Sequence, residues 1–558
     1  MRLLRLAAVP VALGVALTTA CSGDNTGELN ITPLPVADIN ERPREQLTTG
    51  GELRVPVTEL GTSLNPLSSD ASPEMDEVRR AFLPTLFDVS STGEVKPNPN
   101  FLTDAKVTSP PGSPTTVTLT LNPDAKWGNG DQVTAEDVVA TWRACNGQTP
   151  ENRCREGLRL ERIRDIVATS PTEAQVSFNE ADPDWAEVFA HTGIVRASSV
   201  SSPTSFNDDW KEVREAWVSG PYVPTSVNTE HGVISMEPND SWWGEEPPLE
   251  RLTVVERNEG ELDQAFAKND VDALEVGTSP DAFTTGQENP DAVMHRSGGT
   301  EARTLVFNTQ SAGPVSDQGV RTAIALTLDR SRVGTEAMPG IDHTAAALDN
   351  RVFRYGQEGY VDNAETTEMT RDVRKARKAL DAAGWKTEGD GTRSRDGQPL
   401  EIAMVRVTGD PVSEHEFTAI SQQLNEVGIK VVPEDIDVNS WADGAALGSG
   451  TFQMAAVTEE QSVSPTSELP ARFAKGGARN WSKLSVPEIE TALEELNAET
   501  DPARRRGIAN RIDELAWTHM GTLPLYQVPE TTFTRSRLAN YGANGIGTVD
   551  WSTVGYVK

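Results

Sequence analysis

The chain has 558 residues, of which 37% are hydrophobic and 24% charged, the composition of an ordered protein with more than one domain. The 84 acidic residues outnumber the 50 lysines and arginines and give a formal net charge of −34 at pH 7. A surface of this sign repels nucleic-acid phosphates and is not attracted to anionic lipid. We therefore expect no nucleic-acid partner and favour small molecules and proteins as partners.

The first residues of the chain have the pattern of an export signal over residues 1–20. Arg2 and Arg5 precede the apolar run LAAVPVALGVALTTA, which is too short for an ordinary membrane span. The string LTTAC followed by SGD resembles the bacterial lipobox, in which Cys21 becomes the lipidated first residue. The alternative is an ordinary secretory signal that contains a cysteine. Residues 21–50 are polar, contain proline and lack periodicity, which predicts a flexible linker.

Two further cysteines, Cys145 and Cys154, bracket eight polar, turn-forming residues. An exported protein meets an oxidising environment and the spacing permits a small loop, so we predict a disulfide between them. Free thiols or a metal site are less favoured, because the six histidines are scattered without metal-ligand spacing. We expect neither a metal nor another cofactor.

The first half of the chain alternates strand and helix patterns. Residues 51–67 predict a strand and a loop, and residues 74–87 predict an amphipathic helix with Met75, Val78, Phe82 and Leu86 on one stripe. Residues 115–127 alternate as a half-buried strand does. Thr134 then begins a helix, with Asp137 as the acidic partner of a capping box.

The same alternation continues to the C-terminus. We expect strands at residues 232–240, 249–258, 302–310, 399–407 and 430–437. We expect helices at residues 260–270, 318–333, 369–385, 413–429, 485–499 and 501–520, the last two capped by Ser485 and Asp501. Helices between strands favour mixed or parallel sheets covered by helices, and hence a multi-lobed α/β protein.

The usual sequence motifs of catalysis do not occur in the chain. We find no Gly-x-Ser-x-Gly, Ser-x-x-Lys or His-Glu-x-x-His motif, no P-loop, and no Gly-x-Gly-x-x-Gly after a strand. A catalytic triad assembled from distant residues is the remaining alternative. We therefore expect a protein that is not an enzyme.

Several segments, taken in order, resemble the family 5 extracellular solute-binding proteins of ABC importers, which bind oligopeptides and dipeptides. These segments are WGNGDQVTAEDVVATW (127–142), SGPYVPTS, NDSWWGEEPPLERL, VFNTQSAGPVSDQGVRTAIALTLDR, DVRKARKALDAAGW, RDGQPLEI, LNEVGIKV and TLPLYQ. The resemblance implies an α/β fold like that of type II periplasmic binding proteins, a two-lobed clamshell with an additional subdomain. The expected parts are lobe I (51–70, 186–302 and 522–558), the additional subdomain (71–185) and lobe II (303–521).

The resemblance also implies roles for particular residues. Asp317, Arg321, Asp329 and Arg330 then belong to the scaffold as helix caps and ion-pair residues, and not to a catalytic set. Trp242 and Trp243 are expected to pack inside a lobe. Classical peptide binders hold the ligand's α-ammonium with an Asp just beyond a strand of the type FQMAA. Here FQMAAV leads into TEEQ, which places Glu459 or Glu460 there, with Trp481 as the expected aromatic neighbour.

The function that the resemblance implies is binding without turnover. We expect a monomeric lipoprotein on the extracytoplasmic face of the cell membrane that captures short peptides and delivers them to an ABC permease. The alternative in the same fold is a transport-inactive homologue that acts as a regulatory or interaction lipoprotein in cell-envelope glycolipid synthesis. The altered TEEQ segment keeps this alternative open.

Overall fold

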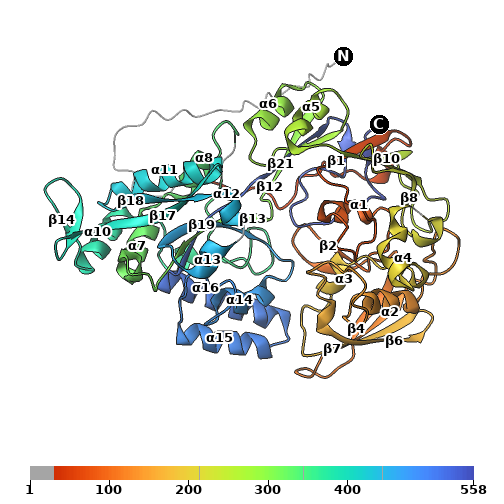
Figure 1. Ribbon diagram of the computed structural model, residues 1–558, viewed down its shortest axis with the longest axis horizontal. Coiled ribbons are helices and arrows are strands. Elements are labelled where there is room, and N and C mark those ends of the chain that lie inside the picture. The colour runs from red at the N-terminus through yellow and green to blue at the C-terminus, as the bar shows by residue number, and fades with distance from the viewer. Residues whose placement is uncertain (1–30, 213, 343–344, 443) are drawn as a thin grey trace, which may run out of the picture.

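The computed structural model describes residues 31–558, except residues 213, 343–344 and 443. The predicted signal segment and Cys21 therefore lie outside the described residues. Figure 1 shows two bodies side by side: a first body built mainly from the N-terminal half, in red to yellow, and a second body in green to blue. Several strands lie between and above them.

The first body contains a four-stranded sheet with the order β1-β10-β9-β8. Its strands are β1 (Glu52–Val57), β10 (Arg251–Glu256), β9 (Val233–Pro238) and β8 (Tyr222–Asn228). β1 is parallel to β10, and the other neighbours are antiparallel. Along β1, Leu53, Val55 and Val57 are buried and alternate with more exposed residues, as the period of a strand with one buried face requires.

A second four-stranded sheet, entirely antiparallel, forms the far part of the first body. Its order is β4 (Leu102–Val107), β5 (Thr116–Leu121), β7 (Glu173–Phe178) and β6 (Ile163–Ser170). Helix α2 (Ala135–Ala144) packs against β6 and β7. The predicted capping box is confirmed, because the Thr134 N–H donates to the Asp137 carboxylate at 2.8 Å. One hydrophobic core runs through both sheets.

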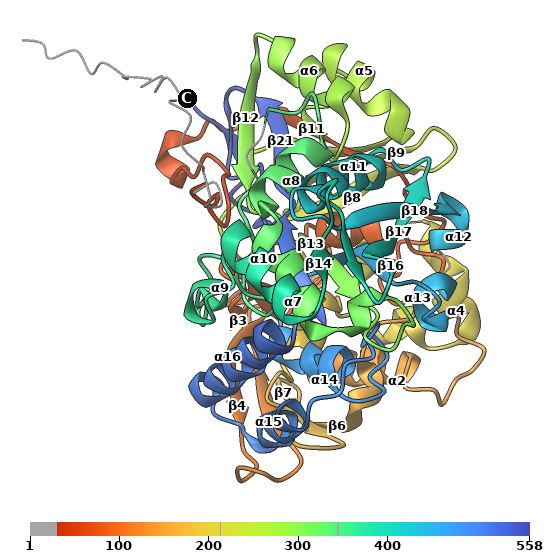
Figure 2. The ribbon, with the colours of Figure 1, turned by 90° about the vertical axis from the view of Figure 1, so that its left-hand side faces the viewer.

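The second body is organised by a five-stranded sheet with the order β18-β17-β19-β13-β20. Its strands are β18 (Lys430–Asp437), β17 (Glu401–Thr408), β19 (Met454–Glu460), β13 (Glu301–Phe307) and β20 (Thr522–Gln527). Helix α11 (Pro411–Asn425) packs on β17, and α8 (Arg330–Ala337) packs on β20. Helices α15 (Pro487–Ala498) and α16 (Pro502–His519) pack together over a smaller core, at the lower edge in Figure 2.

The chain passes twice between a three-stranded sheet and the five-stranded sheet. The three-stranded sheet, β11 (Ala273–Glu275), β21 (Glu530–Arg535) and β12 (Ala292–Ser297), lies at the top of Figure 2. β12 continues into β13, and β20 continues into β21. The two connections touch: Gln527 Nε2 donates to the Gly299 carbonyl at 2.7 Å. Gly299 has φ of +67°, and a Cβ there would lie 2.3 Å from the Val528 carbonyl oxygen, so a side chain does not fit.

Three local predictions are corrected by the structure. The expected helix at 74–87 is reduced to a short 3-10 turn and α1 (Asp76–Arg79), although its apolar stripe is buried; Pro84, which lacks an N–H, is incompatible with a helix interior. The expected helix at 318–333 is two helices, α7 (Gln318–Thr327) and α8, because Asp329 caps the second. α15 begins at Pro487 after Val486, so Ser485 is not its cap.

Residues 21–50 were predicted to form a flexible linker, but the C-terminal part of this segment is paired with other parts of the chain. Asp38 forms a bridge with Ala543, and Leu47 forms one with Val557. Leu47 is 2% exposed and belongs to the buried hydrophobic residues. The segment is polar in composition, but its backbone groups are paired with the C-terminal residues of the chain, and that pairing cannot be recognised from local sequence. The predicted bounds of lobe I, the additional subdomain and lobe II stay a prediction.

Candidate ligand-binding site between the two bodies

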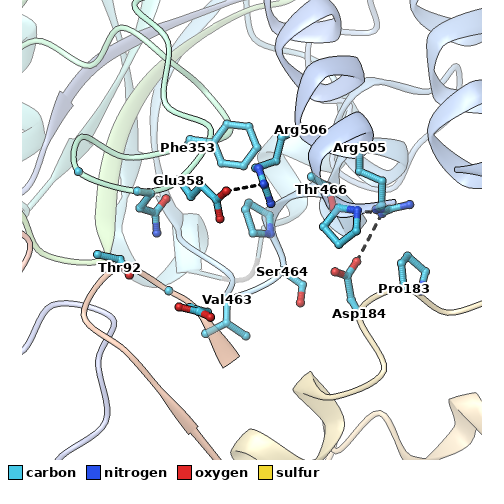
Figure 3. Close-up of a pocket in the computed structure, with 16 residues that line it drawn as sticks. Thr92, Pro183, Asp184, Phe353, Glu358, Val463, Ser464, Thr466, Arg505 and Arg506 are labelled. Atoms are coloured by element: carbon cyan, nitrogen blue, oxygen red, sulfur yellow. Dashed lines mark hydrogen bonds and ion pairs between the residues drawn. The ribbon is translucent and has the colours of Figure 1, made fainter. Parts of the chain in front are cut away.

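A cavity of about 480 Å³ lies where the two bodies meet (Figure 3). The first body contributes Thr92 to Glu94, Pro183 and Asp184. The second body contributes Phe353, Gly356 to Glu358, Val463 to Thr466, Pro502, Arg505 and Arg506. Figure 3 shows Asp184 opposite Arg505, and Arg505 Nη2 lies 3.4 Å from the Asp184 carboxylate. The cavity therefore has walls from both bodies, as a site that closes around a solute requires.

The segment that follows β19, residues 461–468, makes direct contacts with the first body, and we call it the bridging segment. Ser462 Oγ donates to Glu187 at 3.2 Å, and Val463 packs against the core of the first body. Arg159 of the first body binds Glu187 at 2.7 Å and reaches Glu468 at 3.3 Å. Because Glu187 is 3% exposed, these charges meet in a setting that water screens poorly.

A second, smaller cavity of about 20 Å³ adjoins the first, and Pro465 lines both. Its other lining residues are Arg351, Val352, Arg354, Glu459, Glu460, Gln461, Ser462, Glu468, Arg472 and Arg479. The structure thus brings both glutamates that the sequence suggests as ligand anchors to one cavity wall. It also places four arginines there.

Glu459 lies near the end of β19, opposite Ala302 of β13. Its carboxylate accepts a hydrogen bond from Arg472 Nη2 at 2.7 Å and another from Thr304 Oγ1 at 2.9 Å. Its side chain is 16% exposed. Glu459 therefore has a charged partner within its own body, and a ligand ammonium would have to compete with Arg472 for it.

Glu460 is the last residue of β19 and lies opposite Glu301, immediately after the connection between the two sheets. It is exposed. Within the described part of the chain, its carboxylate has no hydrogen-bond or ion-pair partner. Of the two glutamates, Glu460 is the one whose charge is available to a ligand.

Trp481 lies away from the two glutamates. It is half-buried and packs against a small core that includes Val306 and Phe452. The neighbouring Ser482 carbonyl accepts a hydrogen bond from the Thr309 N–H, just beyond the C-terminal end of β13. Glu460 lies at the other end of this strand, where it pairs with Glu301. At roughly 3.3 Å per residue, eight residues of extended chain separate the two places by roughly 25 Å. The structure therefore does not bring Trp481 together with the acidic pair.

The arginines of the smaller cavity are functional candidates that the sequence analysis missed. Arg351 binds Asp513 at 2.9 Å, with both side chains inaccessible to solvent, and its guanidinium lies 4.3 Å from the centroid of the Trp517 ring. Arg354 follows three residues later in the same loop and is 5% exposed. In the sequence, an arginine stands on each side of Val352 and Phe353. This pattern does not reveal which of the two arginines has an ion-pair partner.

Other predicted residues are placed as scaffold. Asp317 accepts a hydrogen bond from the Gly319 N–H, and Asp329 from the Arg332 N–H, so both are helix caps. Arg330 binds Asp349 at 2.7 Å. The disulfide between Cys145 and Cys154 is confirmed, with the Cα atoms 5.8 Å apart.

Among residues 31–558 with the gaps given above, no three His, Cys, Asp or Glu side chains are grouped so that they could hold a metal ion. In the same part of the chain, every helix is too short or too polar to cross a lipid bilayer.

The mixed α/β architecture is that of the type II periplasmic binding proteins. The periplasmic EDTA-binding protein EppA superposes with a TM-score of 0.76 at 22% identity, over 95% of this chain and 100% of its own. Residues 96–480 match the bacterial extracellular solute-binding proteins, family 5 Middle, and the chain belongs to this family.

Two curated relatives extend this assignment. The oligopeptide-binding protein OppA of Mycobacterium tuberculosis is 28% identical, over 98% of this chain and 93% of its own. A second protein of Mycobacterium tuberculosis, named as a lipoprotein, is 23% identical over 76% of this chain and 79% of its own. The chain is thus similar to these proteins over most of its length.

Proposed function

We propose that the protein is a lipid-anchored extracytoplasmic solute-binding protein that captures short peptides and delivers them to an ABC permease. The observation that carries the proposal is the carboxylate of Glu460, which has no partner among the described residues and lies on the wall of a cavity beside the contact between the two bodies. The likeness to an oligopeptide-binding protein over 98% of this chain supports a peptide as the solute.

Glu460 is our proposed anchor for the α-ammonium of the peptide. A carboxylate and an ammonium form a charge-assisted hydrogen bond, which is stronger than a bond between neutral groups. Glu459 is the weaker candidate because its charge is already neutralised by Arg472. Trp481 lies at the other end of the strand, and we propose that it packs there without touching the ammonium group.

The contacts between the bodies support capture by closure. Asp184 with Arg505, and Arg159 with Glu187 and Glu468, hold the bodies together around the larger cavity. A peptide main chain can be held there by backbone hydrogen bonds, while its side chains extend into hydrated space. These contacts would bind a peptide without changing it. Binding without turnover agrees with membership of a solute-binding family and with our proposal that the protein is not an enzyme.

We propose that the anchor is an acyl chain on Cys21. The apolar run before Cys21, and the relative that is named as a lipoprotein, support this. A lipid at that point would keep a monomeric protein beside its permease.

One observation favours the alternative function. In that alternative the protein is a regulatory or interaction lipoprotein in cell-envelope glycolipid synthesis and does not serve transport. The ion pair between Arg472 and Glu459 neutralises one of the two acids at the expected ammonium site. A protein that has no need of a ligand could keep such a pair for its structure alone.

Calorimetry with a set of tripeptides to pentapeptides tests the proposal. We expect Glu460→Gln to weaken binding by roughly 1.5–3 kcal/mol, since it removes a charge-assisted hydrogen bond. Glu459→Gln should have a smaller effect, and Glu488→Gln, on the exposed side of α15, serves as the matched control.

N-acetylated peptides provide a second control, because they lack the α-ammonium. They should bind the wild type and Glu460→Gln equally weakly. If Glu460→Gln binds free peptides as tightly as the wild type does, Glu460 is not the anchor. If the wild type binds none of the peptides, the regulatory alternative gains.

A further inference from the structure

Arg79, the last residue of α1, is a buried arginine with one side of its guanidinium unused. It is 3% exposed. Its Nη1 donates to the Ser72 carbonyl at 2.9 Å and to the Asp76 carboxylate at 2.6 Å. Its Nε and Nη2 are both fully buried, and neither has a hydrogen-bond acceptor among the described residues. Buried donors without an acceptor are rare in folded proteins, so these two indicate a partner that the chain itself does not supply.

Nε and Nη2 form the side of a guanidinium that binds two oxygens at once, because their N–H bonds are parallel. The same side holds carboxylates elsewhere in this protein. Arg54 binds Asp272 through Nε at 3.0 Å and through Nη2 at 2.8 Å. Arg406 binds Asp435 in the same way at 2.7 Å and 2.9 Å. The unused side of Arg79 therefore fits a group with two oxygens better than it fits single water molecules.

The side chains around Arg79 leave an excess of positive charge. Asp76 is the carboxylate partner of both Arg79 and Arg155, which it contacts at 2.6 Å and 2.8 Å. Two guanidinium groups thus share one carboxylate. Burial, together with the nearby Arg155 and against the opposing effect of Asp76, lowers the pKa of Arg79 to about 10, so its charge persists at neutral pH. One further anion would balance this group of charges.

Arg79 lines a cavity of about 60 Å³ inside the first body. Its other walls come from the loop after β1 at Pro66, from the end of α3 (Glu187–His191), which Figure 1 shows in the same body as α1, and from the C-terminal segment at Thr548. Val549, next to Thr548, belongs to the core of this body. A water molecule needs roughly 10–15 Å³, so the cavity has room for an anion of about four heavy atoms. No lining residue is shared with either cavity described above, and the site is therefore distinct from the candidate ligand site.

Thr85 provides a second unused donor on the wall of this cavity. It is 6% exposed, and its hydroxyl has no hydrogen-bond partner among the residues that the structure describes. Glu77 also lines the cavity and would oppose an anion. Burial raises the pKa of Glu77 to about 7, so it is protonated in about half of the molecules at neutral pH. Since Glu77 and Asp76 would both repel an anion of higher charge, a monovalent anion fits best.

We propose that the first body binds a small monovalent oxyanion, of the class of acetate, bicarbonate and nitrate, between the unused side of Arg79 and the hydroxyl of Thr85. The site is independent of the captured solute, because its walls belong to the first body alone. The anion contacts α1 and reaches the walls formed by α3 and the C-terminal segment, and it stabilises the folded state by binding to it alone.

The test is thermal unfolding of the full chain at neutral pH in sodium acetate and in sodium chloride of the same ionic strength. Acetate should raise the unfolding temperature of the wild type more than chloride does, because chloride has no pair of oxygens, and its concentration dependence gives a Kd. Arg79→Lys keeps a cation for Asp76 but cannot bind two oxygens side by side. We expect it to raise the Kd for acetate about 10-fold to 100-fold. Arg374→Lys, on the exposed face of α10 (Val373–Ala382), is the matched control and should respond as the wild type does.

A second variant tests the site even if Arg79→Lys does not fold. Glu77→Gln removes the carboxylate that opposes the anion, and it should lower the Kd for acetate several-fold. Equal effects of acetate and chloride on the wild type would show that the cavity takes only water, and would overturn the proposal. An acetate response of Arg79→Lys equal to that of the wild type, or a Kd of Glu77→Gln no lower than that of the wild type, would overturn it as well.

Peptide binding separates this site from the candidate ligand site between the bodies. In calorimetry, Arg79→Lys should bind trialanine with the affinity of the wild type, with or without acetate. If Arg79→Lys loses trialanine and acetate competes with trialanine for the wild type, the site takes a carboxylate of the solute and the proposal of an independent anion is wrong. If the wild type binds no peptide but shows the predicted acetate response, the proposed function fails and the anion site stands.

Discussion

Glu416 on α11 is inaccessible to solvent and joins three elements of the second body. Arg303 of β13 donates to it through Nε at 2.9 Å, and the Tyr526 hydroxyl of β20 donates at 2.6 Å. Burial and the adjacent carboxylate raise the pKa of Tyr526 well above its ordinary value, so the hydroxyl keeps its proton and remains a donor. The cluster ties the helix to the two strands that lead to the crossing connections.

We expect Glu416→Gln to lower the free energy of unfolding by about 3–5 kcal/mol, because it leaves the charge of Arg303 buried without a carboxylate. Urea unfolding followed by circular dichroism measures this change. The exposed Glu488→Gln should stay within about 0.5 kcal/mol of the wild type. Equal midpoints for Glu416→Gln and the wild type would show that the ion pair adds nothing to stability.

Residue roles were predictable from the sequence where they depend on neighbours along the chain. The cap at Asp501 is an example, because a cap binds backbone groups two or three residues away. The pairing of Arg472 with Glu459 was not predictable, and neither was the burial of Arg354. Both depend on which loops meet in space, and no local pattern contains that information.

At the scale of single elements, the disulfide lies where α2 ends and an irregular loop begins. Cys145 is the C-cap of the helix, and Cys154 forms a bridge with Ser68. The bond therefore fixes a loop of the first body, which takes part in the contact between the bodies through Arg159.

We expect the double variant Cys145→Ser/Cys154→Ser to lose about 2–3 kcal/mol of stability, since a loop of this length gains that much chain entropy when the bond is absent. Differential scanning calorimetry of the variant and of the oxidised wild type measures the shift. Peptide affinity should change little, because the disulfide does not line either cavity of the site. An unchanged unfolding temperature would contradict this prediction.

Element types were more predictable than element ends. The strands that became β9, β10, β13, β17 and β18 show clear apolar patterns and were expected within a few residues of their observed positions. The helix expected at 318–333 was divided by Asp329, whose role as a cap competes with continuation of the helix. The C-terminal part of the linker is held by contacts with residues about 500 positions away.

At the scale of the whole molecule, two bodies meet through ion pairs and through the bridging segment, beside a cavity of about 480 Å³. The two connections between them lie next to each other, at Gly299 and Val528. Two adjacent connections permit the bodies to rotate with few broken contacts, which is the arrangement that capture of a solute needs. Family membership was predictable from ordered short segments, whereas the identity of the solute was not.

The central claim, that this protein captures short peptides between its two bodies, is tested most directly by identifying what it carries. The protein is purified from its native host without added ligand and denatured, and the released molecules are analysed by mass spectrometry. We predict a mixture of short peptides with free amino and carboxyl ends, which is greatly reduced for Glu460→Gln. Release of other solutes without any peptide would contradict the account.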